Sequence, residues 1–337
     1  MVQSKMSNYY GTLFKNILIG LICLNASASD NIIRISGSST AYPFITTIAQ
    51  MFSLTHNKDN IIVESTGTGN GLQLFCSGSD NHYPDLASAS RAIKPSEVAL
   101  CNSHKINNIL EINYGYDGII IANAQMDSNI NISRKELFLA LADTIPIKGK
   151  LIKNPYQKWS DVNPSLPDVS IELYGPASTS GTRDEFDQIV MENSCGNFPE
   201  YARAKRKCPN IRTDGKYIEI GNNENLIIQK LKKNKDAWGV IGYNFFRNNL
   251  EDLKSVTIDG VTPSPNNIRE GSYALSRPLL LYAKADNQNK LAEPVKIFLQ
   301  TATSENTVGE NGYLANKGLI PLQDKDLKEV QKIISAH

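Results

Sequence analysis

Histidine and cysteine are scarce in this sequence, and neither forms a motif that binds a metal ion. The 337 residues include four histidines and five cysteines, and no Cys-x-x-Cys or His-Glu-x-x-His pattern occurs among them. We therefore expect no structural zinc site and no zincin-type metalloenzyme. The Gly-Lys-Ser/Thr ending of a nucleotide-binding loop, the Gly-x-Gly-x-x-Gly fingerprint of dinucleotide-binding folds and the Gly-x-Ser-x-Gly motif of serine hydrolases are missing too.

The sequence also has almost no net charge. Its 35 basic and 34 acidic residues give a net charge of +1 at pH 7, whereas a nucleic-acid-binding domain carries a basic surface or stripe. We therefore expect no nucleic-acid partner. A hydrophobic content of 41% with 20% charged residues excludes a disordered or collagen-like chain. The length predicts about two domains, and no linker rich in Pro, Gly or Ser separates them.

The apolar run nearest the amino terminus has the features of an export signal. Two lysines precede an apolar run over residues 17–24, and an Ala-x-Ala cleavage site ends at Ala28. A run of this length cannot cross a hydrocarbon core about 30 Å thick. We predict that residues 1–28 are a signal peptide. The alternative is a lipoprotein anchored at Cys23, which the large residues before this cysteine disfavour.

Export changes both the charge and the cysteine count. The mature chain has 33 basic and 34 acidic residues, a net charge of −1, and four cysteines. An even number of cysteines in an exported protein suggests disulfides. Four cysteines allow three pairings, and we predict the local one; the alternative is four buried free thiols. The predicted pairs are Cys76–Cys101 and Cys195–Cys208.

Short apolar segments alternate with helical ones along the mature chain, which predicts an α/β fold with mainly parallel sheet. Two longer strand-like segments, residues 109–124 and 273–285, could cross between two lobes built from non-contiguous chain. The strands expected besides these are residues 32–36, 61–64, 85–90, 169–174 and 239–243. The expected helices are residues 42–53, 70–76, 95–105, 134–142, 183–193, 223–232, 291–302 and 324–335.

Four polar segments follow strands or open helices, and they carry the chemistry that we can predict. Three of them are Gly/Ser/Thr turns that present backbone N–H groups and hydroxyls at a helix N-terminus, where an anion is stabilised. Carboxyl ends of strands are where open α/β sheets bind ligands. The alternative for any one segment is a simple helix cap. The four segments are residues 36–43, 66–71, 89–91 and 178–184.

In these segments the sequence resembles the periplasmic phosphate-binding proteins of phosphate ABC transporters, over nearly the whole mature chain. The resemblance implies a two-lobed type II periplasmic-binding-protein fold with two crossover strands as a hinge. It implies lobe I over residues 29–114 and 273–337, lobe II over residues 115–272, and a ligand cleft between them. The matching motifs are Gly37–Pro43 (GSSTAYP), Gly67–Leu72 (GTGNGL), Asp85–Arg91 (DLASASR), Gly175–Asp184 (GPASTSGTRD) and Leu275–Tyr282 (LSRPLLLY).

Matched motif by motif, the resemblance implies which residues bind phosphate. Many family members have an aspartate in place of Arg91 and an arginine near Pro176, so the single cation of the site would have moved between lobes. We nominate Asp184 as the carboxylate that accepts the proton of phosphate and so rejects sulfate; the alternative is a first-turn acid favoured by the helix dipole. Arg183 could contact the anion or pair with Asp184. The implied ligands are Ser39, Thr40, Thr68, Ser90, Arg91, Ser180, Gly181 and Thr182.

The sequence therefore predicts a monomeric, periplasmic, high-affinity phosphate receptor that delivers its ligand to an inner-membrane ABC permease. We expect no enzymatic activity, no cofactor and no metal. The alternatives are a receptor for sulfate, molybdate or a phosphonate, a secreted phosphatase with Ser38, Ser39 or Thr40 as nucleophile, and an adhesin or signalling module on the same fold.

Overall fold

The computed structural model describes residues 32–56, 61–125, 129–221 and 223–337. The predicted signal peptide, residues 1–28, lies outside the described residues. None of the helices in the described ranges has the length and apolar character that a membrane span requires.

The strands belong to one large mixed sheet and two short pairs. They are β1 (Ile33–Gly37), β2 (Ile61–Ser65), β3 (Leu86–Ala89), β4 (Ile109–Asn123), β5 (Asn131–Ile132), β6 (Thr144–Ile147), β7 (Lys150–Lys153), β8 (Leu173–Gly175), β9 (Tyr217–Glu219), β10 (Trp238–Gly242), β11 (Lys254–Ser255), β12 (Thr257–Ile258) and β13 (Ser276–Lys284). The large sheet has the order β2-β1-β3-β13-β4-β10-β8-β9, with β11 also paired to β4. The strands at its two ends are parallel, β1 with β2 and β3, and β8 with β9 and β10.

The helices connect these strands and follow most of them directly. They are α1 (Tyr42–His56), α2 (Thr68–Cys76), α3 (Pro95–Ser103), α4 (Arg134–Leu141), α5 (Trp159–Val162), α6 (Gly181–Phe186), the π-helical η1 (Asp187–Glu192), α7 (Asn193–Cys195), α8 (Pro199–Arg203), α9 (Glu224–Lys233), α10 (Tyr243–Arg247), α11 (Pro265–Arg269), α12 (Glu293–Ala302), α13 (Glu305–Val308), the 3-10 helix η2 (Ala315–Lys317) and α14 (Asp324–Ala336).

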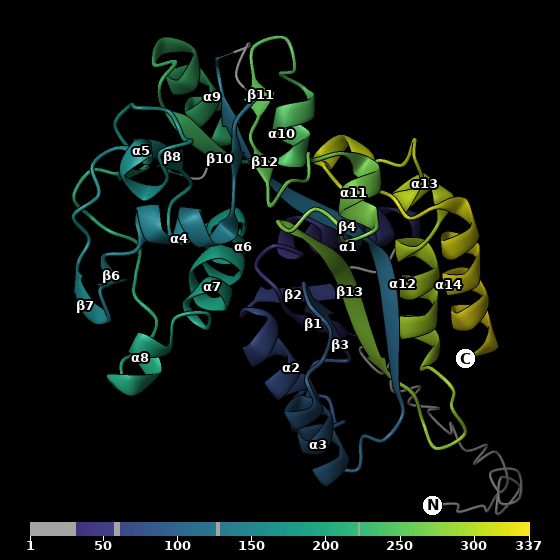
Figure 1. Ribbon diagram of the computed structural model, residues 1–337. Helices are drawn as coiled ribbons and strands as arrows, with labels where there is room; N and C mark the ends of the chain where they lie inside the picture. Colours follow the sequence, from purple (N-terminus) through teal and green to yellow (C-terminus); the bar gives the residue numbers. More distant parts are fainter. Residues whose placement is uncertain (1–31, 57–60, 126–128, 222) are drawn as a thin grey trace, which may run out of the picture. The chain divides into compact units, whose positions relative to one another are not determined.

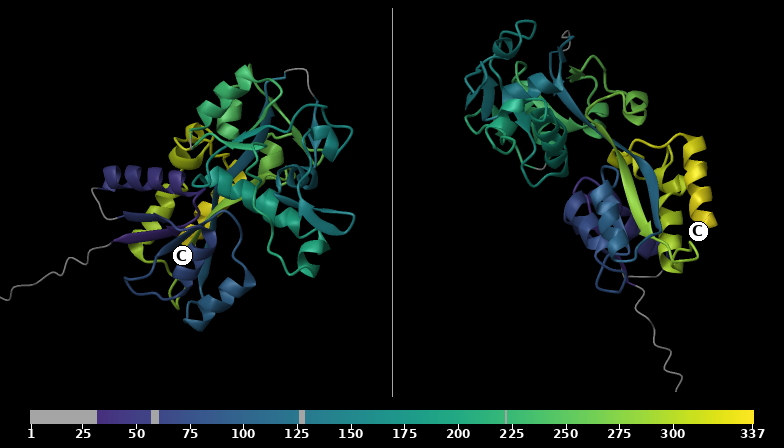
Figure 2. Two further views of the ribbon diagram at one scale, coloured as in Figure 1. Left: turned by 90° about the vertical axis from the view of Figure 1, so that its left-hand side faces the viewer. Right: turned by 60° about the horizontal axis from the view of Figure 1, so that its bottom comes forward.

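The two long strands β4 and β13 pair with each other and link the two ends of the sheet. They run antiparallel from Ile109 opposite Lys284 to Gly118 opposite Ser276, and Figure 1 shows them side by side. Beyond Gly118, β4 continues as the partner of β10. The right-hand view of Figure 2 also shows these two long strands running together. The predicted α/β fold with two crossover strands is confirmed.

Two separate hydrophobic cores form on the two ends of this sheet. The core at one end consists of two clusters, built by side chains from residues 33–114 and 279–334. The other is packed by side chains from residues 119–275 together with Ile320. In the second core the rings of Trp159 and Trp238 stack with centroids 3.9 Å apart. The boundary between the two cores therefore falls within β4 and β13.

Helix α1 shows how the sequence orients the site. Phe44, Ile48 and Phe52 recur every four residues, so they form one buried face, and Phe52 packs edge-on against Phe298 of α12, with ring centroids 5.5 Å apart. Only residues 38–41 connect β1 to α1. The amino end of α1 therefore lies at the edge of the sheet where the parallel strand β1 ends.

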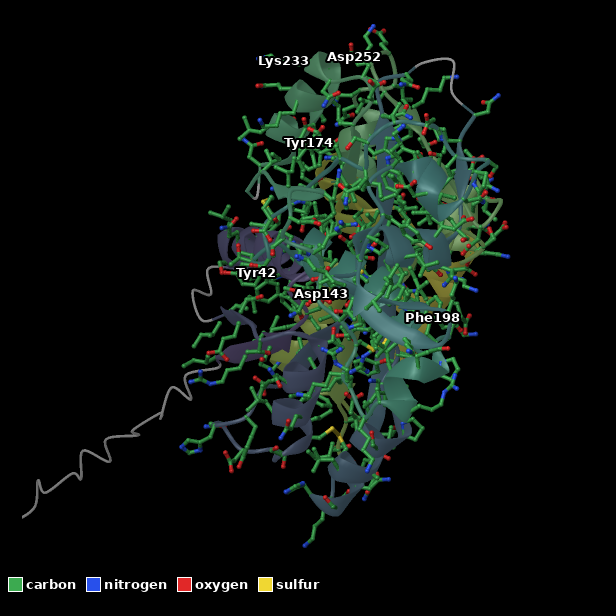
Figure 3. The ribbon with its side chains drawn as sticks, turned by 60° about the vertical axis from the view of Figure 1, so that its left-hand side comes forward. Tyr42, Asp143, Tyr174, Phe198, Lys233 and Asp252 are labelled. Carbon is green, nitrogen blue, oxygen red and sulfur yellow. A yellow bond between two sulfur atoms is a disulfide. The ribbon has the colours of Figure 1, made fainter. Side chains whose placement is uncertain are left out.

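Two cysteine pairs tie neighbouring helices and loops together. The sulfur atoms of Cys76 and Cys101 are 2.00 Å apart and join α2 to α3, and those of Cys195 and Cys208 are 2.25 Å apart and join α7 to the loop after α8 (Figure 3, yellow). These are the two local pairs. The loops that they close span 25 and 13 residues.

Among the elements that differ from the sequence-based expectations are α6, β8 and the β6–β7 hairpin. The helix expected over residues 183–193 begins at Gly181 and continues through η1 to Cys195. The strand expected over residues 169–174 is the shorter β8, whose register starts at Leu173. The β6–β7 hairpin was not predicted, because Pro146 interrupts the apolar pattern of its first strand.

Candidate functional site

The first and third polar segments pack against each other at the ends of β1 and β3. The backbone N–H of Ser38 donates to the carbonyl oxygen of Ser88 at 2.9 Å. Gly37 has a φ of 151°, and a Cβ at this position would lie 1.9 Å from the same carbonyl oxygen. Glycine is required here because it allows the two strand ends to approach this closely.

The second segment lies against the first through a further close glycine contact. The N–H groups of Thr66 and Gly67 donate to the carbonyl oxygen of Gly37 at 3.0 and 2.8 Å. Helix α2 begins with Thr68, whose hydroxyl oxygen lies 3.2 Å from that of Ser90 and accepts a hydrogen bond from the N–H of Ser90. The three predicted segments are therefore neighbours at one edge of the sheet.

Arg277, on β13, places a buried guanidinium between these segments. Its Nη1 donates to the hydroxyl of Ser90 at 3.1 Å, and its Nη2 donates to the hydroxyl of Thr40 at 2.6 Å. The side chain is only 6% exposed. This role of Arg277 was not predicted from the sequence. The available signal was the familial segment LSRPLLLY, which contains Arg277 but gives no reason to place it beside Thr40.

The fourth segment opens α6, which packs in the second core, and it contacts the first segment. Thr40 donates to the carbonyl oxygen of Gly181 at 3.2 Å, and Ser39 donates to the carboxylate of Asp184 at 2.9 Å. A Cβ on Gly181 would lie 2.8–2.9 Å from backbone atoms of Ser39 and Thr40. The first residues of α6 have N–H groups without acceptors inside the helix, so they add donors to this cluster.

The structure thus brings most of the predicted residues together, but the side chains of Thr182 and Arg183 bind other partners. Thr182 donates its hydroxyl to Glu224 at 2.8 Å. Ser180 is the N-cap residue of α6, yet its side chain makes no cap hydrogen bond. Arg183 pairs with Asp187 and Glu219, both at 2.8 Å, rather than with Asp184.

Arg91 stands next to Ser90 but has a carboxylate partner of its own. Its two Nη atoms contact the two carboxylate oxygens of Glu97 at 2.9 and 2.7 Å. Burial disfavours the ionised form of Glu97, but the hydrogen bonds from Arg91 and from the N–H of Lys94, together with the positive charges of both residues, outweigh it and lower the pKa of Glu97. The positive charge of Arg91 is therefore balanced locally.

Three carboxyl groups that were not predicted from the sequence lie beside the cluster: Glu185 and Glu224 are buried, and Asp117 is half-buried. Glu185 forms an ion pair with the Nε of Arg277 and is fully buried. Burial raises the pKa of Glu185 well above its usual 4.5, and it also raises the pKa of Asp117. Glu224 accepts hydrogen bonds from Thr182 and from the N–H of Gly242, and burial raises its pKa to about 7.

Hydroxyls, amides and one buried guanidinium at converging helix starts are suited to hold an oxyanion. Within the described ranges, no group of three or more His, Cys, Asp or Glu side chains is placed to hold a metal ion. His56 lies at the opposite end of α1 from the cluster, so it cannot act as a base for Ser39 or Thr40.

Comparisons with known proteins agree on one family. Residues 25–306 match the family model described as the PBP superfamily domain. The chain is 30% identical to the phosphate-binding protein PstS of Staphylococcus haemolyticus, over 88% of this chain and 85% of PstS. It is 27% identical to the protein SphX of Synechocystis, over 88% of this chain and 82% of SphX. A possible phosphate-binding protein from Planctomyces limnophilus superimposes with a TM-score of 0.72 at 27% identity, covering 90% of this chain and 98% of that one.

Proposed function

Because this chain belongs to the PBP superfamily, and within it to the family of the PstS phosphate-binding proteins, we propose that it is an exported receptor for inorganic phosphate. It acts in the periplasm after removal of residues 1–28, as a monomer, and delivers phosphate to an ABC-type permease in the inner membrane. It is a receptor and not an enzyme. The two hydrophobic cores support a division into lobe I, residues 29–114 and 273–337, and lobe II, residues 115–272.

A single observation carries this proposal: the guanidinium of Arg277 is hydrogen-bonded to Thr40 and Ser90 where three helices begin. These hydroxyls can turn to donate to an anion that takes their place on the Nη atoms. Arg91 stays a candidate ligand, although Glu97 already balances its charge. The proposed donors are Ser39, Thr40, Thr68, Ser90, Ser180, Gly181 and Thr182, the last two through their backbone N–H groups.

Asp184 is the proposed acceptor for the proton of phosphate. It already accepts a hydrogen bond from Ser39, so its carboxylate faces the first polar segment. Phosphate near neutral pH carries a proton that this carboxylate can accept, whereas sulfate carries none. Sulfate would meet a like charge without a shared proton, which costs several kcal/mol.

Calorimetric titration of the mature chain with phosphate and then with sulfate tests both parts of the proposal. We expect phosphate to bind, and sulfate to bind at least roughly 100-fold more weakly, which corresponds to about 3 kcal/mol. If phosphate produces no binding heat, the receptor proposal is wrong. If sulfate binds equally well, only the role of Asp184 is wrong, and a general receptor for tetrahedral oxyanions becomes the better description.

A further inference from the structure

All three side-chain nitrogen atoms of Arg277 have partners, and only two of these atoms contact side chains that we propose to bind the anion. Nη1 and Nη2 contact Ser90 and Thr40, on the strand-end loops. The third, Nε, is paired with Glu185 of α6, whose side chain is fully buried. The ion pair therefore lies behind the face that a bound anion would contact.

A second carboxyl, on the neighbouring strand, completes this arrangement. Asp117 stands opposite Arg277 in the register of β4 and β13. Arg277 therefore has two carboxyl neighbours, Glu185 at its Nε and Asp117 on the strand opposite it, and, besides burial, the negative charge of Asp117 helps to raise the pKa of Glu185. One guanidinium balances only one of two negative charges, so ionisation of one carboxyl disfavours ionisation of the other.

The charges around the pair show why it should hold a proton. Arg277 is the cation that faces both carboxyls, and burial disfavours ionisation of Asp117 and Glu185. The other groups that face the pair are Glu224 on α9, which repels the charge of Asp117, and Tyr114 on β4, which stays neutral. Asp184 lies on the same helix as Glu185, and Arg183 is bound to other carboxylates on that helix and on β9. With one proton the pair and Arg277 are neutral together; without it they carry a net negative charge beside the anion site.

We propose that Asp117 and Glu185 form a proton-binding pair that is coupled to the anion site through Arg277, so that phosphate binding favours the protonated pair. The inference rests on the proposed function, because it needs an anion at Arg277. A bound dianion adds negative charge on the Nη side of the guanidinium, and the second negative charge on the Nε side then becomes less favourable. Binding should therefore draw a proton into the pair at any pH where the free protein has partly lost it.

The test is proton uptake during phosphate binding. Titration calorimetry in two buffers with different ionisation enthalpies gives the number of protons taken up, and the comparison is between the wild type and Glu185→Gln. The glutamine side chain can accept from the Nε of Arg277 and donate to Asp117, so it imitates the protonated pair permanently. Ionisation of phosphate itself contributes equally to both proteins, so the difference between them isolates the pair.

We expect the wild type to take up more protons than Glu185→Gln, by up to about one proton per phosphate, and its affinity to fall more steeply as pH rises. Glu192→Gln is the matched control, because Glu192 is an exposed glutamate of the same helical run; it should take up as many protons as the wild type. Asp117→Asn should behave like Glu185→Gln, which keeps the test valid if one variant fails to fold.

Two results would overturn the inference: equal uptake in the wild type and both pair variants across the alkaline range, or a loss of uptake in Glu192→Gln. Neither result would affect the proposed function, since phosphate would still bind in each case. Absence of any binding heat in the wild type would instead contradict the receptor proposal itself.

Discussion

At the scale of single residues, the two arginines of the site have different electrostatic surroundings. Arg91 makes a two-pronged contact with Glu97, and both side chains are partly exposed. Arg277 is buried, and its Nη atoms have only hydroxyl partners, which a stronger acceptor can displace. An anion should therefore gain more from Arg277, because no carboxylate competes for its Nη atoms.

Substituting lysine for each arginine compares the two roles directly. Lysine keeps the charge but loses the planar fork that contacts two acceptors at once. Arg277→Lys should weaken phosphate binding by roughly tenfold or more, whereas Arg91→Lys should weaken it by less than about threefold. Phosphate titrations with thermal unfolding as a check on folding give both values. The reverse ranking would show that Arg91, and not Arg277, is the main positive charge that binds the anion.

Part of this site could be predicted from the sequence, and the rest could not, because it depends on contacts between residues far apart in the chain. Thr40, Thr68 and Ser90 could be found because each follows a strand that ends at the same sheet edge. Arg277 reaches Ser90 from 187 residues away in the chain, and no local pattern reports such a contact. Glu185 was hidden in the same way, because its place in the first turns of a helix resembles that of any surface acid.

At the scale of elements, the alternation of strands and helices was enough to predict the fold class but not how closely the elements approach. The start of α6 is the clearest example. The sequence predicted a helix from residue 183, and the structure begins it at Gly181, directly against Ser39 and Thr40. Only the contact between the start of α6 and the first polar segment shows that glycine is needed there, because a larger residue would not fit.

Gly181→Ala tests this close approach. The added Cβ would lie under 3.0 Å from backbone atoms of Ser39 and Thr40, so α6 or the first segment must move away. We expect phosphate affinity to fall by roughly tenfold, about 1.4 kcal/mol, with little change in thermal stability. Gly196→Ala is the matched control at the other end of the helical run, because its Cβ would meet no atom closer than 3.5 Å. Unchanged affinity in Gly181→Ala would show that the helix start need not approach the first segment to bind phosphate.

At the scale of the whole molecule, the near-zero net charge of the chain gives no sign that acidic residues gather at the site. Near-zero net charge alone excluded polyanionic partners, yet Asp117, Glu185 and Glu224 all lie beside the polar segments, and Glu185 is paired with Arg277. Their pKa values are all raised, chiefly by burial. The folded protein therefore binds protons that the unfolded chain releases, and this links the chemistry of the site to the stability of the fold.

Glu224 provides the measurable case, because burial raises its pKa from the usual 4.5 to about 7. Between these two values the folded state binds more protons than the unfolded state, so the free energy of unfolding must fall as pH rises through this window. The loss attributable to Glu224 is at most about 3 kcal/mol and is complete above the folded-state pKa. Urea unfolding at about pH 5 and about pH 8 should show it as a lower midpoint at the higher pH. Glu224→Gln, which cannot ionise, should lose that part of the pH dependence even though the amide leaves Thr182 or Gly242 without one acceptor. An undiminished pH dependence in this variant would assign the effect to Asp117 and Glu185 alone.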